Sequence, residues 1–311
     1  MKEFLKINYM QLKSIIAVLL FGAVSLNSNG QQIFTLSQYT QHNFIINPAA
    51  SGANEQGSVG VSYRKMWQGI DGGPQTTILF ADKYFAKKKT GVSIALYDDK
   101  TGPTARTGGQ VGVSYSVDLE KGRRIQFGLG GQVLQYSINK SEVTNSSYFD
   151  LGDSYFLNGP GSLVRGDASA GIYYRSNTFN AGIAAQQLIQ SKLEFIKGTS
   201  SENQGSFSRH YFLTADYKFQ VDEDNVVIPS TMFKYLPNSP LDFELGARLE
   251  HKNILWVGFG YYVRQSYTAY AGLKIKNALA LGYAYQEYNT PLSAFDKGSG
   301  SHELSLRYFL K

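Results

Sequence analysis

The chain has 311 residues, a formal net charge of +6 and no cysteine. Without cysteine it can have neither disulfides nor a lipid-modified N-terminal cysteine. The mild positive charge has one dense run, Lys87-Lys88-Lys89, which argues against a nucleic-acid partner. Its 32 glycines, 22 tyrosines and 19 phenylalanines against 8 prolines are typical of many strands joined by turns. Tyrosine suits the edge of a bilayer, although a soluble β protein can bury the same rings in its core.

Residues 1–30 predict a secretory signal peptide. Three lysines precede an apolar run from Ile15 to Val24, and small residues just before Gln31 offer a cleavage site. The run is too short to cross a hydrocarbon core of about 30 Å as a helix. We therefore expect an exported chain in which residues 31–56 form a lead-in segment, either a periplasmic tail or a plug.

Apolar and polar residues alternate with period two in one segment after another, which predicts β-strands. Val111, Val113 and Val117 would point to one side of the sheet, and Ser114 and Ser116 to the other. We expect about fourteen strands, at residues 57–66, 74–83, 90–99, 106–119, 123–138, 165–176, 178–187, 207–220, 225–235, 241–251, 253–263, 266–275, 277–288 and 301–310.

The lengths of the predicted connections favour a membrane barrel over a soluble sandwich. Alternation alone fits both, because an apolar face can meet either a second sheet or lipid. All the long connections, at 139–164, 188–206 and 289–300, fall in odd-numbered gaps, and the even gaps are compact. Bacterial outer-membrane barrels have this asymmetry, with long loops outside and short turns in the periplasm. We predict an all-β transmembrane antiparallel barrel over residues 57–311, in the outer membrane.

Several motifs resemble one known family. INPAASG (46–52) followed by YRKMWQGIDGGPQT (63–76) is similar to the hallmark of the PorP/SprF family. Later blocks match in order: SRHYF, IPSTMFKY, WVGFGYY, ALGYAYQ and GSHELSLRYF. One position departs from the family pattern, since Gln286 stands where aspartate is frequent.

The resemblance implies an integral outer-membrane component of the type IX secretion system of Bacteroidetes-type bacteria, which also supports gliding motility. Some members of the family associate with the secretion machinery, and others serve the secretion or surface attachment of one adhesin. The implied partners are secretion-system subunits, a secreted adhesin with a C-terminal signal domain, and outer-membrane lipid. The two branches stay open at this point.

The hallmark supplies the candidate partner-binding residues. They are Asn47, Pro48, Gly52, Tyr63, Arg64, Trp67, Gly69, Asp71, Gly72, Pro74 and Thr76. One interpretation is an inward-folded loop in which Arg64 pairs with an interior carboxylate such as Asp71, because buried charges need partners. The other is a docking surface with Trp67 as an aromatic anchor and Arg64 as a charged contact, since both residue types are enriched in binding hot spots.

The sequence offers little for catalysis, so we predict no enzyme activity, no cofactor and no metal. His42, His210, His251 and His302 are not in paired metal-ligand spacing. Gly128, Gly130 and Gly131 are expected to form a bulge, and 222–224 a solvated turn. A diffusion porin or small-molecule transporter remains the alternative function, because a polar inner face would also permit it.

Overall fold

The computed structural model describes residues 33, 35–144, 160–193, 205–237, 239, 241–291 and 293–310. The predicted signal peptide, residues 1–30, lies outside the described residues. So do residues 145–159 and 194–204, which belong to two of the predicted long connections.

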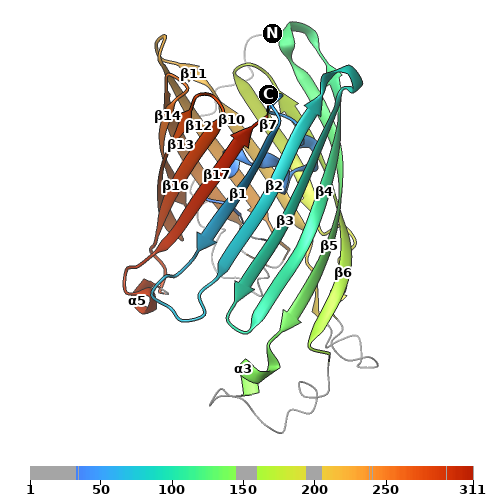
Figure 1. The fold of residues 1–311 in the computed structure, drawn as a ribbon, viewed down its shortest axis with the longest axis vertical. Helices are drawn as coiled ribbons and strands as arrows, with labels where there is room; N and C mark the ends of the chain where they lie inside the picture. The colour runs from blue at the N-terminus through green and yellow to red at the C-terminus, as the bar shows by residue number, and fades with distance from the viewer. Residues whose placement is uncertain are drawn as a thin grey trace, which may run out of the picture.

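The described residues form a closed antiparallel β-barrel (Figure 1). Its fourteen long strands are β1 (Ser58–Lys65), β2 (Gln75–Phe85), β3 (Thr90–Thr101), β4 (Thr104–Asp118), β5 (Arg124–Ile138), β6 (Ser162–Arg175), β7 (Phe179–Gln186), β10 (His210–Tyr217), β12 (Asn225–Tyr235), β13 (Asp242–His251), β14 (Leu255–Tyr262), β15 (Ser266–Ile275), β16 (Leu279–Tyr288) and β17 (Ser301–Phe309). Neighbours in sequence pair with each other, and the pairings β1–β17 and β10–β12 close the wall. The predicted barrel and strand number are confirmed.

The remaining elements are short. They are β8 (Lys192–Leu193), β9 (Gly205–Ser206), β11 (Phe219–Gln220), α2 (Asn43–Ile46), α3 (Lys140–Thr144), α5 (Ser293–Asp296) and the 3-10 turns η1 (Tyr39–Gln41), η2 (Pro48–Ala50), η3 (Ala86–Lys88) and η4 (Glu120–Gly122). The predicted strand 207–220 is divided, because β10 ends at Tyr217 and β11 begins at Phe219. Among the described residues, no helix is long and apolar enough to cross a membrane.

The wall has an apolar outer face and a polar inner face. In β4, Val111, Val113 and Val117 are exposed, whereas Ser114 and Ser116 are buried. Leu129 in β5 is 71% exposed, which is a costly arrangement in water and a favourable one against lipid. Strand alternation therefore turns the apolar set outward all round the barrel, as the sequence pattern predicts.

Aromatic residues form two belts on the outer face. One belt lies at the end of the barrel where β1 ends. It includes the stacked pairs Tyr261–Tyr267, with ring centroids 5.0 Å apart, and Phe233–Phe243, with ring centroids 4.3 Å apart. The other lies at the opposite ends and includes Phe179 and Tyr217, 6.4 Å apart. Such paired belts mark the two boundaries between lipid and water in membrane barrels.

Connection length differs between the two ends of the barrel. Residues 86–89, 119–123, 176–178, 218–224, 252–254 and 276–278 make the turns at what we call the short-turn end. The opposite, long-loop end carries the connections 139–161, 187–209 and 289–300, as well as 66–74. In Figure 1, α3 and α5 lie at the long-loop end, and the C-terminus lies at the other. This is the sorting of connections that the sequence predicts.

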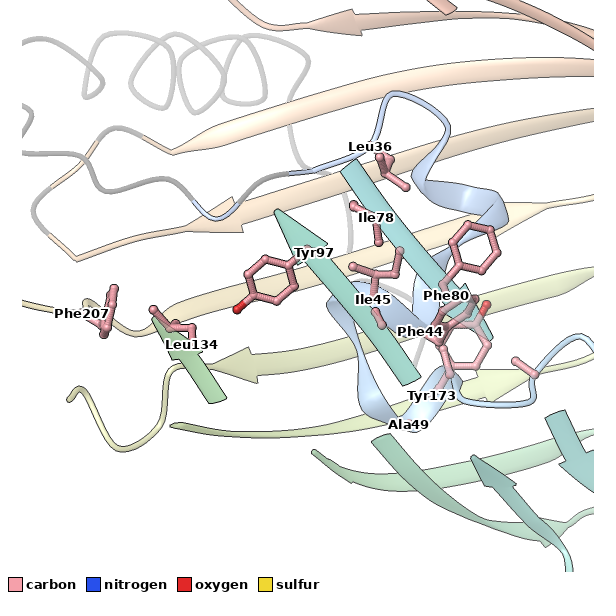
Figure 2. Close-up of a cluster of buried hydrophobic side chains, with 13 residues drawn as sticks. Leu36, Phe44, Ile45, Ala49, Ile78, Phe80, Tyr97, Leu134, Tyr173 and Phe207 are labelled. Atoms are coloured by element: carbon pink, nitrogen blue, oxygen red, sulfur yellow. The ribbon is translucent and has the colours of Figure 1, made fainter. Parts of the chain in front are cut away.

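Residues 35–56, which we call the inner segment, lie inside the barrel. Their apolar side chains share one buried cluster with the wall, composed of Leu36, Phe44, Ile45, Ala49, Ala50, Ala53, Ile78, Phe80, Ala95, Tyr97, Leu134, Tyr173 and Phe207 (Figure 2). A second cluster joins Tyr39 and Ile46 to Ala184, Phe212 and Met232. The inner segment thus supplies the hydrophobic core that a polar-lined barrel otherwise lacks.

The inner segment runs along the barrel from one end to the other. Thr35 lies at the long-loop end, where its carbonyl oxygen accepts a hydrogen bond from Arg64 near the end of β1. Glu55 lies at the short-turn end, where its carboxylate is 2.8 Å from Arg124 at the start of β5. The chain then enters β1 at Ser58.

Candidate functional site

The first part of the hallmark, Asn47 to Gly52, packs directly on a floor of wall glycines. A Cβ at Gly128 would lie 2.2 Å from the backbone nitrogen of Ala49, and one at Gly91 would lie 1.8 Å from the carbonyl oxygen of Ser51. Pro48 opens η2 between them. Because real Cβ atoms do not approach so closely, these wall positions admit the segment only as glycine.

This packing corrects the predicted glycine bulge. β5 keeps an unbroken register with both β4 and β6 through Gly128, Gly130 and Gly131. Gly131 faces outward, with nothing within 4 Å of a Cβ placed on it, whereas Gly128 receives the inner segment. The glycines are therefore explained by close approach of a second backbone rather than by an irregular ladder.

Asn47 and Gly52 hold the two ends of this contact. The Asn47 amide donates to the carbonyl oxygens of Ile172 and Ile183 at 3.2 and 3.3 Å, and its own oxygen accepts from the Ala49 N–H at 2.9 Å. Gly52 has a φ of +66°, and a Cβ there would lie 2.8 Å from the carbonyl oxygen of Lys83. Both residues anchor the inner segment and neither reaches an open surface.

The second part of the hallmark lines a cavity of about 510 Å³ at the long-loop end, which we call the vestibule. Its wall residues lie at or near the ends of strands β1 to β4 and β12 to β16. The beginning of the inner segment forms its floor. The lining includes Arg64, Trp67, Pro74 and Thr76 from the hallmark, together with Thr35, Ser37, Asp99, Arg106, Lys234, Asp242, Tyr262, Gln265, Gln286 and Tyr288.

Arg64 is the link between the vestibule and the inner segment. Its buried guanidinium donates to the carbonyl oxygen of Thr35 and to Oε1 of Gln286, and its Nε lies 4.0 Å from the carboxylate of Glu303. Glu303 in turn accepts a 2.7 Å hydrogen bond from the Ser37 N–H. One arginine therefore connects β1, β16, β17 and the inner segment.

Arg64 lies beside an interior carboxylate, as one interpretation of the hallmark expected, but that carboxylate is not Asp71. Asp71 is exposed in the connection after β1, whereas the interior carboxylate beside Arg64 is Glu303. Gln286 is the position that departs from the family pattern. It still contacts a basic side chain, because its amide oxygen accepts a hydrogen bond from Arg64. An amide here serves the hydrogen bond without adding a second negative charge beside Glu303.

The other charges of the vestibule are matched in pairs. Arg106 lies 3.0 Å from Asp99, and Lys234 lies 2.8 Å from Asp242. Thr76 adds a 2.7 Å hydrogen bond to Asp99. Pairing keeps these groups satisfied at the edge of the core, so the vestibule presents polar groups without a large field of one sign.

The 66–74 connection borders the vestibule and is bonded to the 289–300 connection and to the start of β17. The Gly69 N–H donates to Asp296 at 2.7 Å, and the Trp67 N–H donates to Ser301 Oγ at 3.2 Å. The Trp67 ring lies 6.2 Å from that of Tyr288. Gly72, with a φ of +74°, accepts a 2.8 Å hydrogen bond from the Gly102 N–H. Trp67 thus presents a fixed aromatic ring to the vestibule.

Tyr63 is separated from the other hallmark residues. It is 41% exposed on the outer face of β1, where it belongs to the aromatic belt of the long-loop end. Of the eleven hallmark candidates, four meet in the vestibule, three hold the inner segment, three shape the connection and Tyr63 faces outward. The hallmark is therefore two sites joined through Arg64.

The described residues hold no group of three or more potential metal-ligating side chains. His42 and His210 are buried at separate places, His251 bonds Asn225 and His302 bonds Tyr283. In the turn after β11, hydrogen bonds from Asn225 and from the Asp224 N–H lower the pKa of the Asp222 carboxyl. The Asp222 carboxylate therefore accepts hydrogen bonds from its own turn. Within the described part of the chain, the four histidines therefore lie in separate surroundings.

Sequence reasoning missed the partners of Arg64. Glu303, Gln286 and Thr35 sit on three segments distant in sequence from Arg64, and each is one polar residue among many. The available signal was a charged residue on the inward-facing register of a strand, as at Glu303 between Leu304 and His302. That signal marks an interior charge without naming its partner.

Comparison with known proteins gives a family match and a fold match. The family model described as "Type IX secretion system membrane protein PorP/SprF" matches residues 28–308. No curated protein matches the sequence. The solved structure of the toluene transporter TbuX of Ralstonia pickettii is similar at 10% identity and a TM-score of 0.50, covering 86% of this chain and 92% of that one. The outer membrane protein Omp33 of Acinetobacter baumannii matches at 9% identity and a TM-score of 0.46, covering 83% of this chain and 98% of that one. The likeness to TbuX shows the fold alone.

Proposed function

Because the chain belongs to the PorP/SprF family of type IX secretion system membrane proteins, we propose that it is a non-enzymatic, non-conducting outer-membrane component of that system. Its partners are polypeptides that bind at the long-loop end: secretion-system subunits, or a secreted adhesin with a C-terminal signal domain. In this role the barrel assists secretion or surface attachment of cargo, including adhesins of gliding motility, and serves as a lipid-embedded support for a binding site.

The observation that carries the proposal is the occupied lumen. Polar side chains from around the wall bond the inner segment: Gln110 in β4, Gln186 in β7, Arg248 in β13, Trp256 in β14 and Glu303 in β17. A diffusion porin needs a water-filled channel. A barrel whose lumen is crossed by its own chain, with specific bonds on all sides, has its accessible binding groups at its two ends.

The vestibule is the binding surface that we favour. Trp67 supplies a large amphipathic ring held by backbone bonds, and such rings anchor protein interfaces because little entropy is lost on binding. The paired charges around it supply donors and acceptors for a polypeptide backbone. The vestibule therefore suits a polypeptide segment better than a single small ion.

Site-specific photo-crosslinking in intact bacteria tests this proposal. A photoreactive residue at position 67 should yield adducts that contain a secretion-system subunit or a secreted protein with a C-terminal signal domain, identified by mass spectrometry. The same residue at Val111, on the lipid-facing side of β4, is the matched control and should yield neither. If position 67 gives only lipid adducts or the same products as position 111, the proposed role of the vestibule is wrong.

A further inference from the structure

The short-turn end carries lysines at backbone positions that lysine rarely occupies. Lys89, Lys121, Lys252 and Lys276 have φ values of 51°, 61°, 52° and 49°, in four different turns. This left-handed region is unfavourable for an ordinary L-residue, and glycine or asparagine normally fills it in such turns. Among the described residues of these turns, the other left-handed positions are indeed glycine or asparagine: Gly122, Asn253 and Asn277.

The repeated choice of lysine at a strained position points to a use for its charge, since backbone strain that persists in a structure is a ground for a hypothesis of function. Lys89 pairs with Asp118 at 2.8 Å, and Lys252 pairs with Asp224 at 3.4 Å. Among the described residues, Lys121 and Lys276 have no carboxylate within ion-pair distance. Their charges are therefore available to a ligand outside the protein.

Lys121 also borders a groove on the outer face of the wall. The groove has a volume of about 390 Å³ and lies between the turns 119–123 and 176–178. Lys121 and Arg123 form its cationic rim, and Glu120 is the only carboxylate within the 119–123 turn. Tyr174 and Phe179, whose rings are 6.0 Å apart, form its floor on the lipid-facing side.

This combination fits the boundary of a bilayer. The aromatic floor belongs to the belt of the short-turn end, so the groove sits where acyl chains give way to headgroups. The turns are only a few residues long, which keeps their lysines at headgroup depth instead of projecting them into the water beyond. A lysine or arginine near an anionic membrane surface is attracted to that surface electrostatically.

We propose that the groove bordered by Lys121, Arg123, Tyr174 and Phe179 binds the phosphate headgroup of an anionic glycerophospholipid in the leaflet at the short-turn end. Lys121 and Arg123 contact the phosphate, and the two rings cover the glycerol and the first carbons of the acyl chains. Lys276, Lys87 and Lys88 extend the same attraction around the rim. The inference requires that the barrel lies in a bilayer and is independent of what the vestibule binds.

Native mass spectrometry of the detergent-solubilised mature chain tests the proposal. Phosphatidylglycerol, phosphatidylcholine and lipid A are added in turn, and the retained lipid is measured for the wild type, the K121Q/R123Q double variant and K297Q. Lys297 is a matched control, because it is an exposed lysine with a φ of 54° at the long-loop end. All variants are first checked for the wild-type thermal unfolding temperature.

The wild type should retain phosphatidylglycerol in preference to phosphatidylcholine. Loss of two cations should weaken that retention about tenfold or more in K121Q/R123Q, while K297Q keeps the wild-type value. Replacing Lys121 alone by asparagine, which suits the left-handed turn, should lower lipid retention without lowering the unfolding temperature. Unchanged retention in the double variant, or a preference for lipid A over phosphatidylglycerol, would overturn the proposal.

Discussion

Gly128 in the barrel wall faces Ala49 of the inner segment so closely that a Cβ at position 128 would lie 2.2 Å from the Ala49 backbone nitrogen. Two backbones in such proximity exclude water and fix each other's position. The contact places the NPAASG part of the hallmark against five adjacent strands, β3 to β7, and gives that motif a structural reason.

Substituting Gly128 by valine should displace the inner segment. The added side chain overlaps Ala49, and overpacking of this kind costs about 1–3 kcal/mol of unfolding free energy. Equilibrium unfolding in detergent micelles measures the loss. Gly131, three residues along the same strand and facing outward, is the matched control, and G131V should be close to wild type. Equal effects at the two positions would show that the inner segment does not pack on Gly128.

Arg64 and Glu303 should be energetically coupled. Removing either partner leaves a buried charge with fewer partners, so R64Q and E303Q should each lower the unfolding free energy by about 1.5–3 kcal/mol. The double variant should lose clearly less than the two single losses added together, because neither charge is then left alone. A double-mutant cycle on unfolding measures this coupling, and strictly additive losses would contradict the contact at 4.0 Å.

Lys276→Gly should stabilise the protein. Glycine occupies the left-handed region without a steric penalty, so relief of the strain at φ 49° should raise the unfolding free energy by about 0.5–1 kcal/mol. The control is Lys100→Gly, an exposed position in β3, where loss of the side chain should cost about 0.5–1 kcal/mol. A destabilised K276G would show that the Lys276 side chain supports the fold. That result would contradict the proposal that this lysine is kept for its attraction to lipid.

Trp67→Ala should weaken partner binding while leaving the barrel intact. An aromatic hot spot contributes about 2 kcal/mol or more, which corresponds to roughly thirtyfold in affinity. Secretion of the partner protein, measured in the culture supernatant, should fall. Tyr63→Leu keeps an apolar side chain on the lipid-facing side of β1 and should leave secretion unchanged. Normal secretion by W67A with reduced secretion by Y63L would move the functional surface to the outer face.

The sequence predicts the barrel well because the alternation of apolar and polar residues within each strand shows which side chains face outward. In β4 the exposed residues Val111, Val113 and Val117 alternate with small or polar residues that include Ser114 and Ser116. The folded wall keeps this alternation, because the valines are exposed and the serines are buried. The sorting of long and short connections is also a linear property. Closure follows, since a membrane leaves no place for an unpaired strand edge.

The interior could not be derived in the same way. Asn47 lies on Ile172 and Ile183, and Arg64 lies beside Gln286 and Glu303, so each contact joins segments more than a hundred residues apart. No local periodicity encodes which polar residue faces which. Asp71 is close to Arg64 in sequence, whereas Glu303 lies directly opposite Arg64 on the adjacent strand β17.

Single-channel recording in planar bilayers tests the central claim most directly, namely that the inner segment closes the lumen of a lipid-embedded barrel. The mature wild-type chain should give no stable conductance steps, whereas a variant that lacks residues 35–53 should give stable ones, because the polar wall is then free to hold water. Stable steps of the same size from both proteins would contradict the account.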